Sequence, residues 1–298
     1  MTKLGRVMTA MVTPFKENGE VDYEQAKKLA LALLDSGSEG LIVVGTTGES
    51  PTLTWDEQIR LFSEVKEAVG DRGAIVAGTG SNSTAEVLEA NREAEKIGVD
   101  ACLLVVPYYN RPTQEGLYQH FETIAENTSL PCILYNVPSR TVANLNAETV
   151  IRLSKIDNII GIKEASANME QIAKIIEDTS DFTVWSGNDS DTFNIMALGG
   201  YGIISVITHL VGRQVREMVD SFVNGDVTKA AALHRKLLPL KDAMFIVANP
   251  CPVKYALNHV GFRVGKPRLP LVEPDEKSAA IIKDTLKKYT IDIIALPS

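Results

Sequence analysis

The sequence has few cysteines and no long apolar run. Three cysteines among 298 residues, Cys102, Cys132 and Cys251, are too few and too widely spaced for a disulfide framework, so we expect buried free thiols in a reducing compartment. No segment approaches the roughly 20 apolar residues of a membrane-spanning helix. The N-terminus also lacks the apolar core and cleavage site of a signal peptide. These absences predict a cytoplasmic protein without a membrane partner.

The sequence also lacks a large excess or long runs of charge of one sign. Lys and Arg number 30 against 38 Asp and Glu, which gives a net charge of −8 without long runs of either sign. This balance argues against nucleic acid or an anionic membrane as a partner. A small anionic substrate stays open, because a local basic pocket outweighs the global charge.

Signatures of common cofactors and metal sites are missing. His120, His209, His234 and His259 lie far apart, with no cysteine or carboxylate at metal-ligand spacing. The chain has neither a Gly-x-Ser-x-Gly elbow nor a Walker-type Gly-Lys-Ser/Thr sequence. The loop at 78–83 begins like a dinucleotide-binding loop but lacks the third glycine. We therefore expect no metal and no cofactor.

The chain does contain a steady alternation of short apolar runs and longer amphipathic segments. Most runs are apolar throughout, as in parallel strands covered on both faces. Eight such units in the first 225 residues or so fit the roughly 250 residues of a (β/α)8 TIM barrel. A doubly wound open sheet is the alternative. The expected strands are 7–12, 41–44, 74–77, 101–106, 132–135, 159–162, 182–185 and 202–206.

Helical segments fill the spaces between these strands and continue after them. The segment at 210–224 would be the eighth helix of the barrel, and the three that follow form a C-terminal three-helix appendage. We predict a catalytic barrel domain over residues 1–224 and a helical domain over residues 225–298. The expected helices are 23–36, 56–69, 84–97, 115–126, 147–155, 210–224, 227–247, 251–260 and 276–288.

Lys163 is the candidate catalytic residue. It ends the apolar run 158–162, and burial disfavours an ammonium and lowers its pKa, which makes the amine a nucleophile towards ketones. Tyr135 ends the preceding strand and can move protons, so the two residues predict Schiff-base chemistry. The alternative is an ion pair with Glu164, which is disfavoured because adjacent residues of a strand point to opposite faces.

Other polar residues also follow predicted strands, where the active site of a parallel barrel lies. The loop with Thr46 and Thr47 has hydroxyls flanked by glycines, which suit an oxyanion, although a tight turn with a helix cap explains it equally well. Tyr108 and Tyr109 are a tyrosine pair of the kind more often found at interfaces. Arg140 could hold a carboxylate or form a surface salt bridge.

Four motifs together resemble the dihydrodipicolinate synthase family of pyruvate-dependent class I aldolases, which share a superfamily with N-acetylneuraminate lyase. The resemblance runs from about residue 5 to the C-terminal helices. The motifs are Gly45-Thr46-Thr47-Gly48-Glu49, Tyr108-Tyr109-Asn110, Tyr135-Asn136-Val137-Pro138-Ser139-Arg140 and Gly161-Ile162-Lys163-Glu164-Ala165.

The resemblance implies a lyase that condenses pyruvate with L-aspartate 4-semialdehyde in the diaminopimelate route to lysine. Lys163 would form an imine with pyruvate, and Tyr135 would carry protons to and from the bound substrate. Thr47 and Tyr109 would extend that relay, with Tyr109 reaching in from the neighbouring subunit of a tight dimer. The assembly would be a homotetramer, a dimer of dimers.

The resemblance also implies how the substrates are held. Thr46 and Thr47 would bind the pyruvate carboxylate, and Arg140 would bind the carboxylate of the semialdehyde. Gly187 and Ile204 would line the pocket through their backbones. The alternative is another aldolase of the superfamily, acting on sialic acid or a 2-keto-3-deoxy sugar acid. Arg140 disfavours that alternative, since a neutral polyol has no need of a guanidinium.

The resemblance further implies L-lysine as an inhibitor at the dimer interface. Trp55 and Gln58 stand where well-known sensitive bacterial enzymes have histidine, and Pro51 replaces a small residue, so the pocket would be reshaped. The candidate site comprises Ser50, Trp55, Gln58, Asn82, Glu86 and Tyr108.

Overall fold

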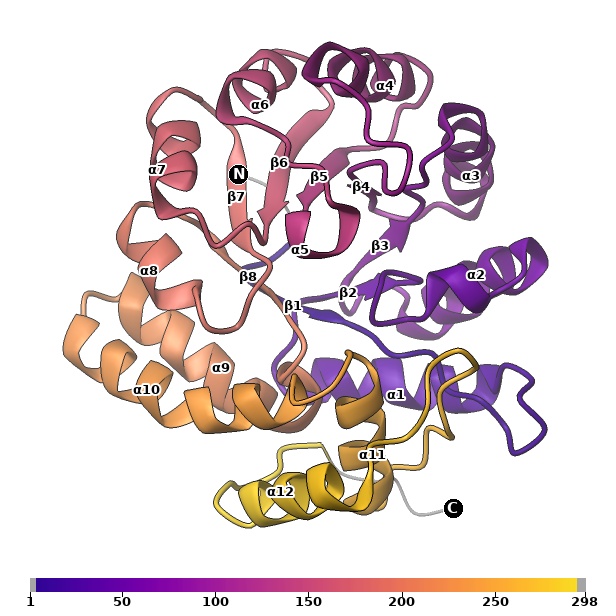
Figure 1. Ribbon diagram of the computed structural model, residues 1–298, viewed down its shortest axis with the longest axis vertical. Helices are drawn as coiled ribbons and strands as arrows, with labels where there is room; N and C mark the ends of the chain where they lie inside the picture. Colours follow the sequence, from indigo (N-terminus) through magenta and orange to yellow (C-terminus); the bar gives the residue numbers. More distant parts are fainter. Residues whose placement is uncertain (1–3, 294–298) are drawn as a thin grey trace.

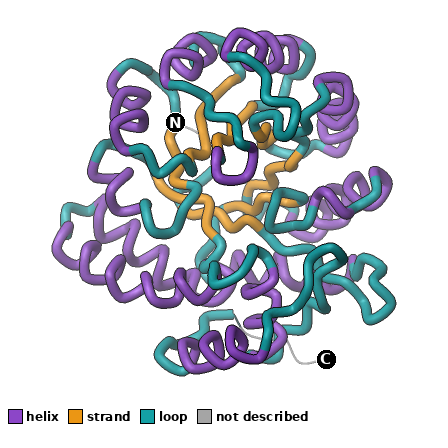
Figure 2. Tube along the Cα trace, viewed as in Figure 1, coloured by secondary structure: helices purple, strands orange, loops and turns teal. Residues whose placement is uncertain are grey.

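The computed structural model describes residues 4–293, and its centre is a closed barrel of eight parallel strands that pair in chain order. Figure 2 shows this ring of strands surrounded by helices. The predicted (β/α)8 barrel is confirmed and the open sheet is excluded, because β1 pairs with β2 on one side and β8 on the other. The strands are β1 (Val7–Ala10), β2 (Gly40–Val43), β3 (Ala74–Gly78), β4 (Ala101–Val105), β5 (Cys132–Asn136), β6 (Ile159–Glu164), β7 (Thr183–Ser186) and β8 (Gly202–Ser205).

The helices are α1 (Tyr23–Asp35), the 3-10 helix η1 (Ser50–Thr52), α2 (Trp55–Val69), α3 (Thr84–Ile97), α4 (Gln114–Glu126), α5 (Pro138–Thr141), α6 (Ala147–Leu153), α7 (Met169–Glu177), α8 (Thr192–Ala197), α9 (Thr208–Val223), α10 (Val227–Met244), α11 (Cys251–His259) and α12 (Glu276–Leu286). The longer helices between strands cover the outside of the barrel, whereas the short α5 is drawn over the ring of strands (Figure 1). Most ends of the predicted helices lie within three residues of these bounds. Helices η1, α5, α7 and α8 were not predicted.

Local sequence sets several of these helix ends. Thr54 and Glu57 form a capping box at the start of α2, in which each side chain bonds the backbone N–H of the other. Ser83 caps the start of α3, and Gly98 ends that helix with a φ of 80°, a conformation that glycine adopts without steric cost.

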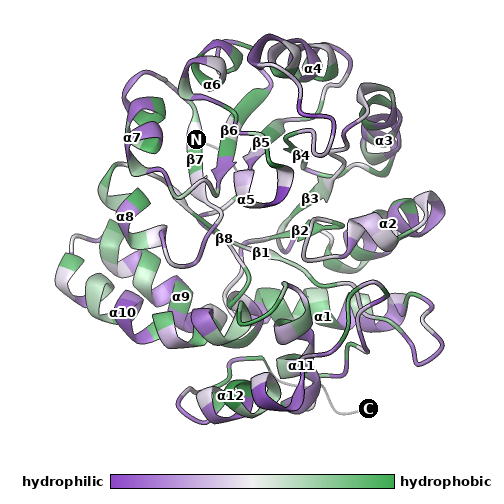
Figure 3. Ribbon diagram, in the orientation of Figure 1, coloured by the Kyte–Doolittle hydropathy of each residue, from purple (hydrophilic) through white to green (hydrophobic). Residues whose placement is uncertain are grey.

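Two apolar layers hold the barrel together. Inside it, side chains such as Met8, Ile42 and Ile133 pack against one another, while a larger layer lies between the strands and the helices. Figure 3 shows the apolar strands inside a ring of mixed helices. The three cysteines are free and buried, as predicted. No helix among residues 4–293 is long and apolar enough to cross a membrane.

The C-terminal helices continue the outer layer. Helix α9 contacts β1, α10 packs along α9, and α12 lies against α10 and α11. In Figure 1 these yellow and orange helices gather at one side of the barrel, next to α1. The expected three-helix appendage is therefore α10 to α12, and a domain boundary near residue 225 stays a prediction.

Candidate active site

Lys163 and Tyr135 are brought together by the register of β5 and β6. The two residues are direct partners across the parallel pair, as the strand ends predicted. The register shifts at Cys132 and Ile133, so that Ile133 pairs with Gly161. Ile133 and Tyr135 belong to the inner layer of the barrel. Since side chains alternate along a strand, Lys163, two residues after Gly161, points to the same interior.

Two glycines make room for this arrangement. A Cβ on Gly161 would lie 2.2 Å from the Thr183 carbonyl oxygen, so only glycine lets β7 approach β6 here. A Cβ on Gly187 would lie 2.9 Å from the Ala165 Cβ and 3.1 Å from the Lys163 Cγ. Gly187 therefore lies directly against the lysine stem.

The lysine amine is buried beside an aromatic ring. Lys163 is 6% exposed, and its Nζ lies 4.4 Å from the centre of the Tyr135 ring. Burial lowers the pKa of Lys163 to about 8, while the negative charge of Asp189 opposes this shift and the positive charge of Arg140 adds to it. An amine with that pKa is about one-tenth neutral at pH 7, far more than an ordinary lysine, and the neutral form is the one that attacks a carbonyl.

Glu164 faces the opposite side of β6 and does not pair with Lys163. Its carboxylate accepts hydrogen bonds from the side chains of Asn136 and Gln171 and from the Ser166 N–H at 2.7 Å. Burial raises the pKa of Glu164, and these donors oppose the rise. The alternative of a buried Lys163–Glu164 ion pair is excluded by this geometry.

Tyr135 is buried beside the lysine with its phenol in a polar corner. Burial raises the pKa of Tyr135, and the Arg140 charge and the Thr46 side chain oppose the rise. The phenol therefore stays protonated at neutral pH and can donate its proton to a group that develops negative charge. Thr46 is half-buried in the loop after β2.

Thr47 and Arg140 are linked through a residue that the sequence did not single out. The Asn249 side chain donates to the Thr47 Oγ1 at 2.9 Å, and Arg140 donates to the Asn249 carbonyl at 3.3 Å. Thr47 is buried, whereas Arg140 lies exposed on α5. Asn249 comes from the segment between α10 and α11, 202 residues beyond Thr47, and nothing in the local sequence marks it.

The two adjacent tyrosines behave differently. Tyr109 is 90% exposed and has a φ of 74°, a left-handed conformation that is uncommon for a residue with a side chain. Tyr108 is 38% exposed, and its carbonyl accepts a hydrogen bond from the Asn82 side chain at 3.1 Å. Tyr109 thus projects away from the barrel of its own chain.

Ile204 lies at the centre of β8, fully buried, and pairs with Met8 of β1. Its side chain belongs to the inner layer, together with Trp185 and Ala165. A backbone contact from Ile204 to a substrate stays a prediction.

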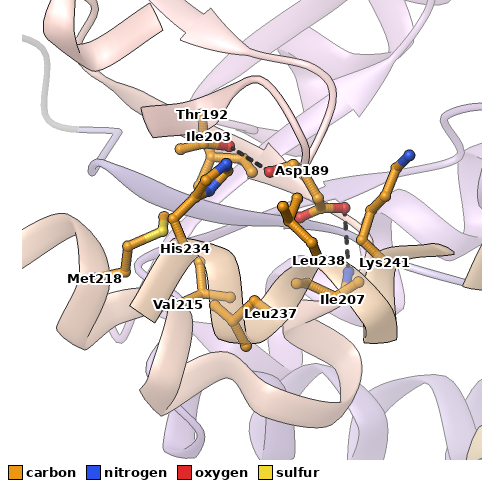
Figure 4. A pocket seen from close by; sticks show the side chains of 10 residues that line it. All are labelled: Asp189, Thr192, Ile203, Ile207, Val215, Met218, His234, Leu237, Leu238 and Lys241. Atoms are coloured by element: carbon orange, nitrogen blue, oxygen red, sulfur yellow. Dashed lines mark hydrogen bonds between the residues drawn. The ribbon is translucent and has the colours of Figure 1, made fainter. Parts of the chain in front are cut away.

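Asp189 is a second residue that sequence reasoning missed. Its carboxylate accepts hydrogen bonds from the Ser205 hydroxyl and from the N–H groups of Val206 and Ile207. Burial raises the pKa of Asp189, and these donors together with the Lys163 charge oppose the rise. Asp189 lines a cavity of about 10 Å³ together with side chains of α9 and α10, including His234. Figure 4 shows these side chains. Asp189 follows β7 by three residues, where a strand-end search would have found it.

A separate cavity of about 380 Å³ lies between the loop after β2, α2 and α3. Five of the six residues predicted for an inhibitor site line it: Ser50, Trp55, Gln58, Glu86 and Tyr108. The sixth, Asn82, joins the rim through its bond to Tyr108. The Thr79 hydroxyl, also in the lining, is buried without a hydrogen-bond partner among the described residues.

No group of three or more His, Cys, Asp and Glu residues among 4–293 is placed to hold a metal ion.

Known proteins resemble this chain over nearly its whole length. The model of the dihydrodipicolinate synthetase family matches residues 3–289. A 4-hydroxy-tetrahydrodipicolinate synthase from Dehalococcoides mccartyi is 65% identical over 294 residues, which is 98% of this chain and 99% of the relative.

Solved structures are also similar to this chain. The structure of the enzyme from Cyanidioschyzon merolae with lysine bound has a TM-score of 0.95 at 44% identity and covers 97% of this chain and 99% of that one. The chloride-inhibited dihydrodipicolinate synthase from Acinetobacter baumannii, complexed with pyruvate, has a TM-score of 0.93 at 38% identity, with 96% and 98% coverage. The chain belongs to the dihydrodipicolinate synthetase family.

Proposed function

We propose that this chain acts as a 4-hydroxy-tetrahydrodipicolinate synthase, condensing pyruvate with L-aspartate 4-semialdehyde through a Schiff base on Lys163. The observation that carries the proposal is the buried pair of Lys163 and Tyr135, set side by side by strand register. The relative from Dehalococcoides mccartyi has this activity in its name, and the Acinetobacter baumannii structure contains pyruvate.

The chemistry follows from the neutral amine. Lys163 Nζ attacks the ketone carbon of pyruvate, and the resulting carbinolamine loses water to give an imine. Loss of a methyl proton gives an enamine, whose carbon adds to the aldehyde of the semialdehyde. The amino group of the second substrate then attacks the imine carbon, closes the ring and releases the lysine. Tyr135 supplies and removes protons at the pyruvate-derived oxygen and carbon.

We assign the carboxylates to two sets of donors. Thr46 and Thr47 bind the carboxylate of pyruvate, and Arg140 binds that of the semialdehyde, because a guanidinium matches a carboxylate with two parallel hydrogen bonds. Gly187 and Ile204 complete the lining. The carboxylate at the far end of the second substrate is what separates this activity from cleavage of sialic acid or a keto-deoxy sugar acid.

Borohydride reduction in the presence of pyruvate tests this function. We expect the mass of a reduced pyruvyl adduct on Lys163, located by peptide mapping. A coupled assay with pyruvate and each candidate aldehyde then separates the semialdehyde from sugar aldehydes. An adduct on another lysine, or none, contradicts the mechanism.

We further propose a tight dimer in which Tyr109 completes the site of the neighbouring subunit, within a dimer of dimers. Its exposure and left-handed backbone support this role, since strain at an exposed aromatic residue is typical of functional sites. Mixing Lys163→Ala with Tyr109→Phe under subunit exchange should restore part of the activity, because one site of each mixed dimer has both residues. If mass measurements show exchange and no activity returns, Tyr109 does not act across the interface.

The cavity of 380 Å³ is proposed to bind an L-lysine inhibitor. Glu86, which lines it, offers a carboxylate to an ammonium group, and the structure from Cyanidioschyzon merolae contains lysine. Calorimetric titration with L-lysine should give binding that Glu86→Gln weakens. Equal affinity in both proteins would place lysine elsewhere.

A further inference from the structure

The segment between α10 and α11 carries Asn249 from the appendage onto the mouth of the barrel. Asn249 is 6% exposed. Its side-chain Nδ2 donates to the Thr47 hydroxyl at 2.9 Å, and its main-chain carbonyl accepts from Arg140 at 3.3 Å. One residue of the appendage therefore contacts both Thr47 and Arg140, two side chains that are proposed to bind the substrates.

The segment that carries Asn249 is also fixed by buried charges to the loop after β2, which contains Thr47. Lys254 of α11 donates to the Glu49 carboxylate at 2.8 Å, and both side chains are fully buried. The Arg268 N–H donates to the other oxygen of Glu49 at 2.9 Å. Glu49 follows Thr47 by two residues in the same loop. The position of Asn249 relative to Thr47 is therefore fixed by the Asn249–Thr47 hydrogen bond and by the bonds of Lys254 and Arg268 to Glu49.

The direction of the Asn249 bond has a chemical consequence. A hydroxyl has one proton to donate and two lone pairs to accept with. Since the Asn249 N–H occupies one lone pair, the Thr47 proton is left for another acceptor. The Asn249 Oδ1 is buried and accepts from no residue among 4–293, and such acceptors are normally met by water or a ligand. An asparagine here thus leaves the Thr47 proton available to the reaction.

We propose that Asn249 is a positioning residue, which orients the Thr47 hydroxyl so that its proton serves the relay with Tyr135 and which steadies Arg140 through its carbonyl. This proposal rests on the proposed function and on the relay through Thr47 that the family resemblance implies. It assigns a part in the reaction to the C-terminal appendage, which otherwise only packs on the barrel.

The test compares two variants of Asn249 with a control in the same appendage. Asn249→Ala removes the donor, and Asn249→Asp keeps the size but replaces the N–H donor with an acceptor that would take the Thr47 proton. Both should lower kcat by about 10²-fold, the loss expected when a reacting group is misplaced, with a smaller change in the KM for pyruvate. Asn258 bonds the backbone at Val264 and Gly265, so Asn258→Ala should leave kcat unchanged.

A double-mutant cycle with Thr47→Val shows whether Asn249 acts through Thr47. If it does, Asn249→Ala combined with Thr47→Val has the kcat of Thr47→Val alone. Multiplying effects, or wild-type kcat in Asn249→Asp, would overturn the proposal. The isosteric aspartate keeps the test valid if the alanine variant fails to fold.

Borohydride trapping with pyruvate separates this inference from the function itself. Wild type, Asn249→Ala and Asn249→Asp should all give the Lys163 adduct, because Lys163 is intact in each. No adduct in wild type defeats the proposed function, and with it the proposal. An adduct in wild type but not in Asn249→Asp shows that Asn249 acts on Lys163 rather than on Thr47, which overturns the proposal alone.

Discussion

Two buried lysines in this chain, Lys163 in the barrel and Lys254 in the appendage, have much in common. Both are buried, and burial lowers the pKa of each to about 8. Each Nζ stands over an aromatic ring, at 4.4 Å from the centre of Tyr135 and at 4.1 Å from that of Phe15. A search for perturbed pKa values alone would select both as nucleophiles.

Their hydrogen bonds separate them. Lys254 donates to the Glu49 carboxylate at 2.8 Å and to the carbonyls of Thr13 and Lys266 at 3.0 and 3.1 Å, which uses all three protons of an ammonium. Lys163 has no such acceptor among the described residues, and its ring neighbour carries a hydroxyl that phenylalanine lacks. A lowered pKa therefore indicates a nucleophile only where the nitrogen is free to lose a proton and reach a substrate.

The largest expected difference is in activity. Lys163→Met should abolish pyruvate trapping and lower turnover on the order of 10⁴-fold or more, because the covalent route is lost. Lys254→Met should still be trapped by pyruvate on Lys163. Mass spectrometry after borohydride reduction checks both. Trapping on Lys254 in the Lys163 variant would mean that the hydrogen bonds do not distinguish the two amines.

The ring neighbours provide the next test. Tyr135→Phe gives Lys163 the same kind of neighbour that Lys254 has, and it should slow turnover by about 10²–10⁴-fold, the usual effect of removing a placed proton donor. Phe15→Tyr is the matched control and should leave turnover unchanged. Steady-state kinetics with both substrates measure the effect. Full activity in Tyr135→Phe would show that the tyrosine only packs.

The stability effects should have opposite signs. Lys254→Met leaves the Glu49 carboxylate buried without its cation and should lower the free energy of unfolding by about 3–5 kcal/mol. Lys163→Met removes a buried charge that has no hydrogen-bonded partner among the described residues and should raise the free energy of unfolding at pH 7, by up to about 3 kcal/mol for a pKa lowered from 10.5 to about 8. The penalty for Lys163 is complete below pH 8 and disappears as the pH rises to 10.5, so the gain should shrink over that range.

Urea denaturation at equal protein concentration measures both changes. Glu49→Gln added to Lys254→Met should recover part of the loss, because the uncompensated charge is gone. If Lys254→Met is as stable as wild type, the buried pair does not hold the appendage to the loop after β2.

The two lysines also show how far the sequence reaches. The strand rhythm predicted the barrel, and the apolar runs before Lys163 and Tyr135 predicted that the two meet, because pairing in a parallel barrel follows chain order. Lys254 lies in a helix, where its neighbours in sequence say nothing of Glu49, 205 residues away. Asn249 was missed for the same reason. Asp189 was missed although it follows a predicted strand, because its hydrogen-bond partners Ser205, Val206 and Ile207 lie 16 to 18 residues further along the chain, at the end of the next strand.

The smallest effect, and the most direct on the chemistry of Lys163, is a shift in pH dependence. Only the neutral amine attacks pyruvate, so the rate of imine formation should rise about tenfold per pH unit below the pKa and level off above about 8. Arg140 lowers the pKa of Lys163 and Asp189 raises it. Arg140→Ala should therefore move the inflection to higher pH, and Asp189→Asn should move it to lower pH. Lys254→Met should leave the inflection in place.

Rates of borohydride-trapped adduct formation with pyruvate alone give the pH profile without the second substrate, whose carboxylate Arg140 would bind. Shifts of Arg140→Ala and Asp189→Asn in the same direction would show that the two charges do not set the reactivity of the amine, and that burial alone separates Lys163 from an ordinary lysine.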